Sequence, residues 1–125
     1  MDEESTGALG QRAEQYAFRY LIRRGLIPVA RNFRTRRGEI DLIMREARCI
    51  ICVEVRYRAS GSFVNARLSV DRHKQAKLGK TAAVFLARNP VFRNYCFRFD
   101  VLGINRDASG QLSVDWLQDA FRPNT

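Results

Sequence analysis

Histidine and cysteine are scarce in this 125-residue sequence, which contains one histidine and three cysteines. The only histidine, His73, stands at the start of a basic helix with no serine or cysteine elbow motif nearby, which argues against Ser-His-Asp or Cys-His catalysis. Cys49 and Cys52 are three residues apart in an apolar strand, so they point to opposite faces, and no Cys/His pair follows at zinc-ligand spacing. We therefore expect these two and Cys96 to be buried thiols of a reducing compartment.

Long apolar runs are also missing. No stretch of the chain approaches the ~20 apolar residues of a membrane span. The N-terminal segment MDEESTGALG is acidic, whereas a signal peptide needs a basic start followed by an apolar run. The sequence thus predicts a cytoplasmic protein without a membrane partner.

Acidic residues and lysines are few beside the arginines. The chain has 13 Asp and Glu against 22 Lys and Arg, a formal net charge of +9, and only three of the 22 are lysines, at positions 74, 77 and 80. Such a charge attracts polyanions, either nucleic acid or anionic lipid headgroups. Arginine can bind a phosphate through two bonds at once, although a GC-rich genome would produce the same bias. The charge limits the class of partner without naming it.

The length and the hydrophobic content of 46% are typical of one domain. We expect a single domain over residues 1–125, with residues 1–6 flexible. Apolar periodicity predicts the order helix, three strands, helix, two strands. The predicted elements span residues 6–24, 26–33, 38–45, 49–57, 71–88, 94–104 and 111–121. The helix in the middle can act as a crossover between parallel strands, so we expect an α/β fold with a mixed sheet flanked by helices.

Local signals mark the ends of these elements. Gly25 follows the first helix where a left-handed cap is favoured, and Asp71 or Ser69 is expected to cap the second helix. The Gly/Ser-containing segment between that helix and the preceding strand, residues 58–69, is predicted to be a mobile loop.

Carboxylates occur within strands that otherwise look buried. Alternation places Glu39, Asp41, Glu54 and Arg56 on one face of the predicted hairpin. If the two-residue turn lies at positions 46 and 47, residue 45 pairs with residue 48 and Glu39 stands opposite Glu54, with Asp41 one diagonal step away.

Opposed like charges are destabilising, so these acids need a cation, a raised proton affinity or arginine partners. A hard divalent ion bound by oxygen atoms, including the carbonyl of Val55, is one solution. Surface ion pairs with Arg56 and the arginines at positions 34, 36 and 37 are the alternative, and this pattern is common on antiparallel sheets.

The motifs GEIDLI, VEVRYR and RFDV, behind a first helix that carries Glu14, resemble the YraN-like family of bacterial proteins. The resemblance covers residues 7–121 and implies the restriction-endonuclease-like fold, with about five strands, of the relatives of Holliday-junction resolvases. It further implies that Asp41 and Glu54 are the two acids of a D-(D/E)-x-K nuclease signature, that Glu14 is an additional helix carboxylate, and that the site takes Mg²⁺ or Mn²⁺.

The sequence departs from that signature at Arg56, which stands where the signature has lysine. A guanidinium can stabilise phosphate charge but cannot be deprotonated to act as a base. Among the three lysines, Lys74 lies one turn before Leu78 and is nearest the core-facing side of its helix. Lys74 is therefore the candidate catalytic lysine, and the alternative is a lysine that contacts phosphate or solvent at a basic helix start.

Arg98 and Asp100 share one strand face of the RFDV motif. We expect Arg98 to pair with a carboxylate of the hairpin and, together with Asp100 and Glu39, to support the site rather than take part in its chemistry.

The sequence thus predicts a metal-dependent nuclease that acts on structured or branched DNA. Backbone phosphates would be contacted by basic residues of the turns and the second helix. These are Arg34, Arg36, Arg37, Arg58 and Lys74. Two alternatives stay open: a DNA- or RNA-binding domain of the same fold without catalysis, which Arg56 favours, and a protein-interaction module with a basic surface. The sequence leaves homodimer formation open.

Overall fold

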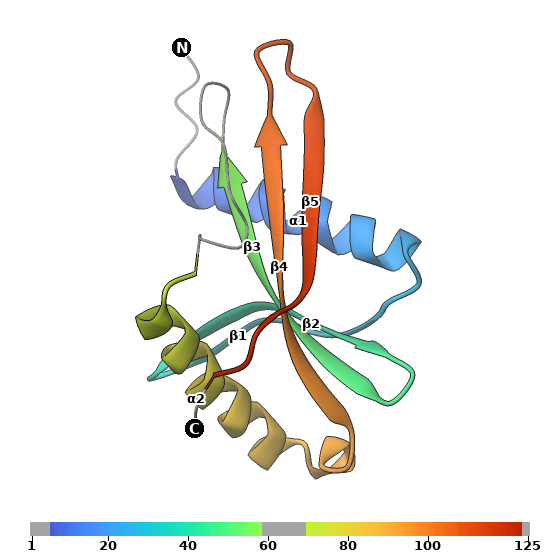
Figure 1. Ribbon diagram of the computed structural model, residues 1–125, viewed down its shortest axis with the longest axis vertical. Helices are drawn as coiled ribbons and strands as arrows, with labels where there is room; N and C mark the ends of the chain where they lie inside the picture. Colours follow the sequence, from blue (N-terminus) through green and yellow to red (C-terminus); the bar gives the residue numbers. More distant parts are fainter. Residues whose placement is uncertain (1–5, 59–69, 124–125) are drawn as a thin grey trace.

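The computed structural model describes residues 6–58 and 70–123. Two helices and five strands follow one another in the predicted order (Figure 1). Their bounds are α1 Thr6–Arg23, β1 Ile27–Thr35, β2 Gly38–Glu46, β3 Cys49–Arg58, α2 Arg72–Arg88, β4 Cys96–Arg106 and β5 Leu112–Phe121. A short 3₁₀ helix, η2 Pro90–Phe92, precedes β4 and was not predicted. No helix in the described part of the chain is long and apolar enough to cross a membrane.

The strands form one mixed sheet in the order β1-β2-β3-β4-β5. The β3–β4 pair is parallel and the other three pairs are antiparallel. A parallel pair needs a long connection, and α2 lies within it, as expected for a crossover. The predicted α/β class, a mixed five-stranded sheet flanked by helices, is confirmed, and the architecture is consistent with a restriction-endonuclease-like fold.

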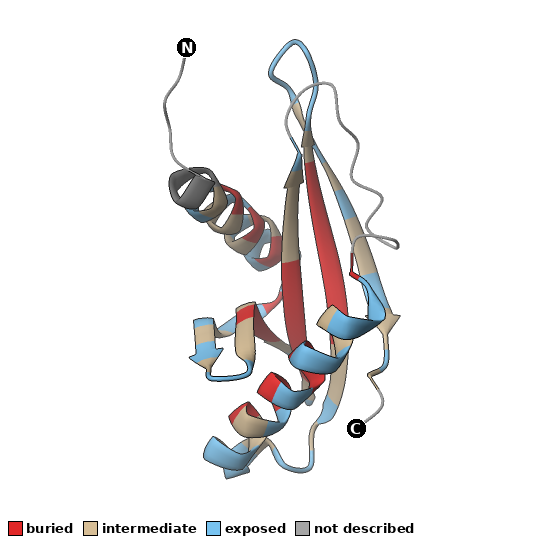
Figure 2. Ribbon diagram, turned by 90° about the vertical axis from the view of Figure 1, so that its left-hand side faces the viewer, coloured by how far each residue is buried: buried red, intermediate tan, exposed pale blue. Residues whose placement is uncertain are grey.

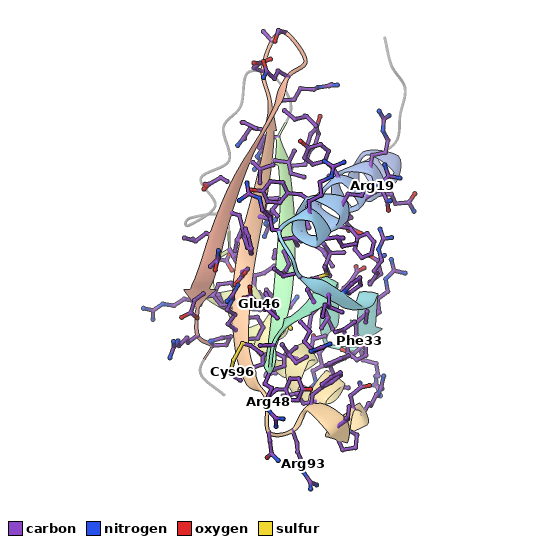
Figure 3. All side chains as sticks on the ribbon, turned by 90° about the vertical axis from the view of Figure 1, so that its right-hand side faces the viewer. Arg19, Phe33, Glu46, Arg48, Arg93 and Cys96 are labelled. Carbon is purple, nitrogen blue, oxygen red and sulfur yellow. A yellow bond between two sulfur atoms is a disulfide. The ribbon has the colours of Figure 1, made fainter. Side chains whose placement is uncertain are left out.

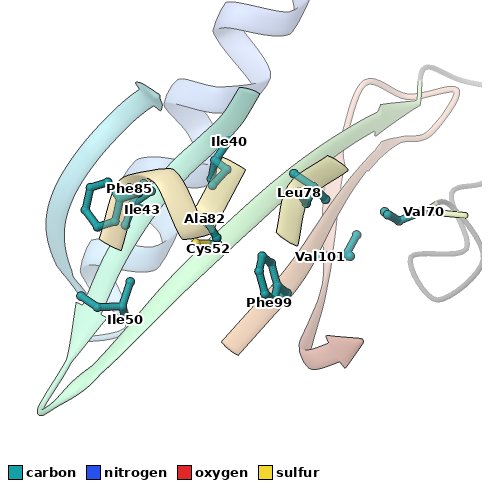
Figure 4. Packing of buried hydrophobic residues seen from close by; sticks show 10 residues of the cluster. All are labelled: Ile40, Ile43, Ile50, Cys52, Val70, Leu78, Ala82, Phe85, Phe99 and Val101. Carbon is teal, nitrogen blue, oxygen red and sulfur yellow. The ribbon is translucent and has the colours of Figure 1, made fainter. Parts of the chain in front are cut away.

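The two helices cover opposite faces of the sheet. Alternate strand residues enter two different clusters, with Met44 and Ile51 packed on the α1 side and Ile43 and Ile50 packed on the α2 side. Figure 4 shows the α2-side cluster, in which Phe85 lies among strand residues. Burial is concentrated along the middle of the strands and on the inner sides of the helices (Figure 2). Charged residues on the sheet therefore lie beside apolar layers.

The helix ends follow the local signals. Gly25 has a φ of 94° and its N–H donates to the Ile22 carbonyl, so the predicted left-handed cap of α1 is confirmed. Asp71 caps α2 by accepting a 2.8 Å hydrogen bond from the N–H of Lys74. Of the loop predicted at 58–69, Arg58 is the last residue of β3, and residues 59–69, Ser69 included, lie outside the described residues. Residues 1–5 of the segment predicted to be flexible also lie outside them, and α1 begins at Thr6.

The β2–β3 register differs from the prediction by two residues. Glu46 pairs with Cys49 and Leu42 with Val53, and Ala47 in the turn has a φ of 51°. The predicted pairing of residues 45 and 48 is therefore wrong, and Glu39 does not stand opposite Glu54. The turn contains neither glycine nor asparagine to mark its position in the sequence. Because the shift is two residues, the side chains of the paired residues 42–46 and 49–53 keep their predicted faces, although Ile40, beyond these pairs, packs with Ile43 in the α2-side cluster rather than with Leu42 and Met44.

The sheet divides into two parts beyond the Leu42–Val53 pair, which is the last pair of the β2–β3 ladder. From there β2 pairs only with β1, as far as Gly38, while β3 continues along β4 as far as Arg58. We call this region the fork, where residues 38–41 of β2 and 54–58 of β3 separate (Figure 1). The carboxylates singled out in the sequence lie at this position.

The expectation of three buried thiols is wrong for two of the cysteines. Cys49 and Cys96 form a disulfide, and only Cys52 is a free, buried thiol. The parallel register places Cys49 directly beside Cys96, although 47 residues separate them, and no spacing rule reveals such a relation. Burial, reinforced by the negative charge of Asp100, raises the pKa of the Cys52 thiol well above its ordinary value, so this thiol is unreactive.

A carboxylate site at the fork of the sheet

Asp41 and Glu54 occupy the first positions beyond the β2–β3 ladder. If the β2–β3 register is continued by one pair beyond Leu42–Val53, Asp41 and Glu54 stand opposite each other. Asp41 Oδ2 accepts a 2.8 Å hydrogen bond from the N–H of Val55. This N–H is directed at β2, and because the strands have separated, the Asp41 side chain takes the place of a strand carbonyl as its acceptor. The backbone of β3 therefore holds the Asp41 carboxylate beside Glu54.

Glu54 is buried, with 6% of its surface exposed, and two cations lie against it. Lys74 Nζ, from α2, is 3.0 Å from Glu54 Oε2, and Arg56 Nη2, from the same strand, is 3.6 Å from that oxygen. Helical periodicity predicted that Lys74 lies near the core-facing side of α2, and the structure places its ammonium at the fork. Arg56 Nε is buried and makes no hydrogen bond within the described residues. Buried donors without a partner are rare in folded proteins.

Glu14 and Glu39 complete the acidic cluster from α1 and β2. Asn32 of β1 connects them when its amide nitrogen is oriented as the donor, at 2.8 Å from Glu14 Oε1 and 3.0 Å from Glu39 Oε2. Arg34 Nε pairs with Glu39 Oε2 at 3.2 Å, so the arginine-pairing alternative holds for this acid. Asn32 has a φ of 52° and was missed in the sequence. An asparagine within a strand, where this residue is disfavoured, is the signal that could have found it.

Proton affinity at the fork is high. Burial, then the negative charge of Glu54, raises the pKa of Asp41 to about 8, although the Val55 hydrogen bond acts in the opposite direction. Burial and then the charge of Glu39 raise the pKa of Glu14. The cluster thus favours either a bound proton or an additional cation.

The donor chemistry of the fork fits a hard divalent cation. Asp41, Glu54 and Glu14 offer only carboxylate oxygens, the ligands that Mg²⁺ and Mn²⁺ prefer. The raised pKa of Asp41 is the expected property of a carboxylate crowded by like charges that a metal ion would balance. In the arrangement observed, the described residues contain no group of three or more His, Cys, Asp and Glu side chains that could hold a metal ion. Two cations of the protein itself, Lys74 and Arg56, lie against Glu54 instead.

The arginines predicted to contact phosphate lie on the parts of the chain that border the fork. Arg36 and Arg37 are exposed in the β1–β2 turn, and Arg58 is exposed at the end of β3. Arg34 is also exposed, with 74% of its side chain accessible, and is held by Glu39. The basic side chains therefore border both separated parts of the sheet.

Asp100 belongs to a different network, between β4 and β5. Its carboxylate is fully buried and accepts hydrogen bonds from Arg98 Nε at 3.0 Å, Trp116 Nε1 at 2.9 Å and the N–H of Asp119 at 2.9 Å. Asp119 has a φ of 51° and lies where the β4–β5 register shifts. Arg98 Nη1 lies 3.9 Å from Glu46 Oε1, a carboxylate of the hairpin. This network ties β5 and the hairpin to β4 and, among the residues that the structure describes, forms no hydrogen bond or ion pair with Asp41 or Glu54.

The fold and the site together define an α/β protein of restriction-endonuclease-like architecture, with carboxylates from two strands and one helix gathered at the fork. The chain belongs to UPF0102, described as an uncharacterised protein family, whose model matches residues 13–104. The predicted resemblance to the YraN-like family is thereby confirmed. The matched range contains all four residues predicted to be catalytic, Asp41, Glu54, Arg56 and Lys74.

Bacterial UPF0102 proteins resemble this chain over most of their length. The protein of Pectobacterium carotovorum is 45% identical over 122 residues, which cover 97% of each chain. The protein of Halorhodospira halophila is 46% identical over 113 residues, covering 90% of this chain and 86% of the relative. The protein of Alcanivorax borkumensis is 43% identical over 112 residues, covering 90% of each chain. The chain thus corresponds to nearly the full length of these relatives.

Proposed function

We propose that this protein binds nucleic acid at the fork and hydrolyses phosphodiester bonds of structured or branched DNA with Mg²⁺ or Mn²⁺. The observation that carries the proposal is the Asp41–Glu54 pair, held on diverging strands with the pKa of Asp41 raised to about 8. Perturbed carboxylates beside specific charged partners are typical of functional sites. The preference for branched DNA rests on the resemblance to Holliday-junction resolvases.

Each residue of the fork has a role that follows from its contacts. Asp41, Glu54 and Glu14 would hold the metal ion. When bound, such an ion polarises a phosphate and lowers the pKa of an attacking water. The guanidinium of Arg56, whose side chain is 31% exposed, would donate to a phosphate oxygen. The Lys74 ammonium donates to Glu54 and has further donors for the same phosphate.

Binding of the substrate would be electrostatic. The exposed Arg36, Arg37 and Arg58 border the fork and are suited to backbone phosphates, which carry no sequence information. A net charge of +9 would accelerate the encounter with DNA at low ionic strength. We therefore expect weak dependence on base sequence and strong dependence on salt.

A second candidate function is nucleic-acid binding without catalysis. It is favoured by Lys74 Nζ, which at 3.0 Å from Glu54 balances one of the proposed metal ligands without any ion. Arg56 favours it too, because a guanidinium cannot exchange a proton with water. The same fold would then present its arginines to DNA or RNA with the carboxylates serving only the structure.

Cleavage assays on a branched junction and a linear duplex, with Mg²⁺ or Mn²⁺, test both candidates. Four proteins suffice, namely the parent, Lys74→Ala, Arg56→Lys and Asp41→Asn. Lys80→Ala is a matched control because Lys80 is exposed on α2, the helix that carries Lys74. If Lys74 supplies the signature ammonium, the parent cleaves, Lys74→Ala abolishes turnover and Arg56→Lys changes little. If position 56 faces the scissile phosphate, the parent is weak or inactive and Arg56→Lys raises metal-dependent cleavage.

The remaining variant, Asp41→Asn, decides whether the fork is responsible. Cleavage that survives Asp41→Asn arises from a contaminant or from different chemistry and refutes the proposed site. Absence of cleavage by all the proteins, with salt-dependent DNA binding retained, establishes the binding domain without catalysis. Absence of both removes the nucleic-acid function and leaves the basic surface to an acidic protein partner.

A further inference from the structure

The outer face of α1 carries basic and aromatic residues in a single stripe. Its positions follow the three- and four-residue spacing that places side chains on one side of a helix. They line an open depression of about 380 Å³. The lining residues are Arg12, Gln15, Tyr16, Arg19, Tyr20 and Arg23. We call this surface the α1 groove. It borders the side of the helix that packs on the sheet, because Tyr20, at its edge, also packs against the α1-side cluster.

Two cations of the α1 groove, Arg19 and Arg23, are available to a ligand. No acidic residue lines the groove, and Arg19 and Arg23, both exposed, make no ion pair with any residue that the structure describes. Glu14, an acid of the same helix, is turned toward Asn32 at the fork. Unpaired arginines without neighbouring acids create a local positive potential, which selects an anionic ligand.

The tyrosines of the groove differ in their surroundings. The Tyr20 ring is held by Arg24, whose guanidinium carbon is 4.7 Å from the ring centroid, and by an edge contact with Trp116 at 6.2 Å. Tyr16 is 39% exposed, which is a large exposure for an aromatic residue in the middle of a helix. The groove therefore combines a fixed ring, an accessible ring and the guanidinium groups of Arg19 and Arg23, which form no ion pair with any described residue.

We propose that the α1 groove binds a single strand of nucleic acid. Proteins hold single strands by combining a positively charged groove that follows the phosphates with aromatic rings on which bases stack. Arg12 and Arg23 are 11 positions apart, about 16 Å along the helix axis, so the groove is long enough for several nucleotides. Arg19 and Arg23 contact phosphates, and Tyr16 stacks on a base.

Other anionic partners fit the groove less well. Bases in a duplex are already stacked, so duplex DNA can use the arginines but not the ring of Tyr16. A helix lying on a membrane inserts its apolar face into the lipid. The apolar face of α1, with Ala13, Ala17 and Leu21, is already buried against the sheet and is unavailable for insertion.

The groove is distinct from the fork, so the inference goes beyond the proposed hydrolysis. Single-strand binding here requires neither a metal ion nor Asp41 and Glu54. The variant Asp41→Asn, combined with EDTA, should therefore bind a single strand as the parent does. Loss of cleavage and loss of groove binding are separate outcomes.

Fluorescence anisotropy with a labelled oligothymidylate of about 12 nucleotides, and with a duplex of equal length, tests the inference. Because each phosphate contact on a single strand contributes about 0.7 to the log–log slope of affinity against salt, the Arg19→Gln/Arg23→Gln variant should lower that slope by about 1.4. The matched control is Arg48→Gln/Arg93→Gln, which removes the same charge from the end of the molecule opposite Arg19 (Figure 3). The control should keep the slope of the parent.

Substitution of Tyr16 separates stacking from charge. Tyr16→Ala should weaken single-strand binding about fivefold or more, whereas Tyr16→Phe keeps the ring and should bind within about twofold of the parent. Duplex affinity should be the same for all three proteins. The inference is overturned if the parent does not bind the oligothymidylate, if both arginine pairs lower the slope equally, or if Tyr16→Ala binds like the parent. Binding of the parent to anionic vesicles in place of the oligonucleotide also overturns it.

Discussion

Replacement of Asp41 by asparagine should stabilise the protein in the absence of metal, and the gain should increase with pH. Asparagine keeps the size of the side chain and an oxygen for the N–H of Val55, which lies 2.8 Å from Asp41 Oδ2. It removes a negative charge that burial and Glu54 both oppose. The substitution therefore isolates the electrostatic cost of Asp41 from its role as a hydrogen-bond acceptor.

The magnitude follows from the pKa of Asp41, which is raised from 3.8 to about 8. Between these values the folded protein holds a proton that the unfolded chain has released, so the free energy of unfolding falls as pH rises through the window. Each unit of pKa difference corresponds to about 1.4 kcal/mol. The raised pKa of Asp41 thus lowers the free energy of unfolding by on the order of 4 kcal/mol at neutral pH and by little below about pH 3, where both states are protonated.

Urea denaturation of the parent and of Asp41→Asn, with EDTA at about pH 5 and about pH 8, measures this effect. The stability difference between the two proteins should be larger at the higher pH. A difference that is equal at both values, or an asparagine variant that is the less stable protein at high pH, refutes the reasoning that the fork crowds unbalanced carboxylates.

Addition of Mn²⁺ then distinguishes a metal site from a cluster of carboxylates whose like charges no metal ion balances. A ligand that binds only the folded state stabilises it by ~2.7 kcal/mol at a concentration a hundred times its Kd. The parent should gain stability with Mn²⁺ and lose much of its pH dependence, whereas Asp41→Asn should gain less. If Mn²⁺ leaves the parent unchanged while Asp41→Asn remains the more stable protein, the carboxylates are unbalanced like charges and the metal proposal is wrong.

Three further predictions concern residues around the fork and the β4–β5 network. Arg36→Gln/Arg37→Gln should lower the log–log salt slope of duplex affinity by about 1.8, measured by anisotropy, and an unchanged slope would place the phosphate contacts elsewhere. Trp116→Phe should cost about 1–3 kcal/mol in thermal denaturation, because the buried Asp100 carboxylate loses a donor, and a neutral result would contradict that role. Asn32→Ala should be about 1 kcal/mol less stable than Asn32→Gly, because alanine disfavours a φ of 52°, and equal stabilities would contradict a fixed left-handed backbone.

Much of the secondary structure could be predicted, because apolar spacing and capping residues are local. The second helix, predicted at 71–88, spans Arg72–Arg88 with Asp71 as its cap. The start of β4 was predicted two residues early, at position 94, because the 3₁₀ helix at Pro90–Phe92 and the turn after it carry no strong periodic signal. Helical periodicity also predicted that Lys74 lies near the core-facing side of its helix, which is the side where Glu54 lies.

The errors arose where two distant segments meet. The turn of the hairpin was misplaced by one residue, and this moved the pairing of Glu54 from Asp41 to Glu39. The Cys49–Cys96 disulfide escaped notice because the spacing of cysteines along the chain does not reveal parallel neighbours. Asn32 was passed over because its contacts with Glu14 and Glu39 depend on how β1 and α1 approach β2.

The sequence alone determined the class of the fold and the alternation of faces along the paired parts of the strands. Alternation along a strand has a period of two, so the common face of Asp41, Glu54 and Arg56 survives a register error of two residues. The tertiary structure decided where β2 and β3 separate, and hence which carboxylate faces Glu54 and which backbone N–H binds Asp41. Burial and the charges of Glu54, Glu14 and Glu39 raise the pKa of Asp41, and the proximity of these groups depends on strand pairing and helix packing rather than on any local pattern.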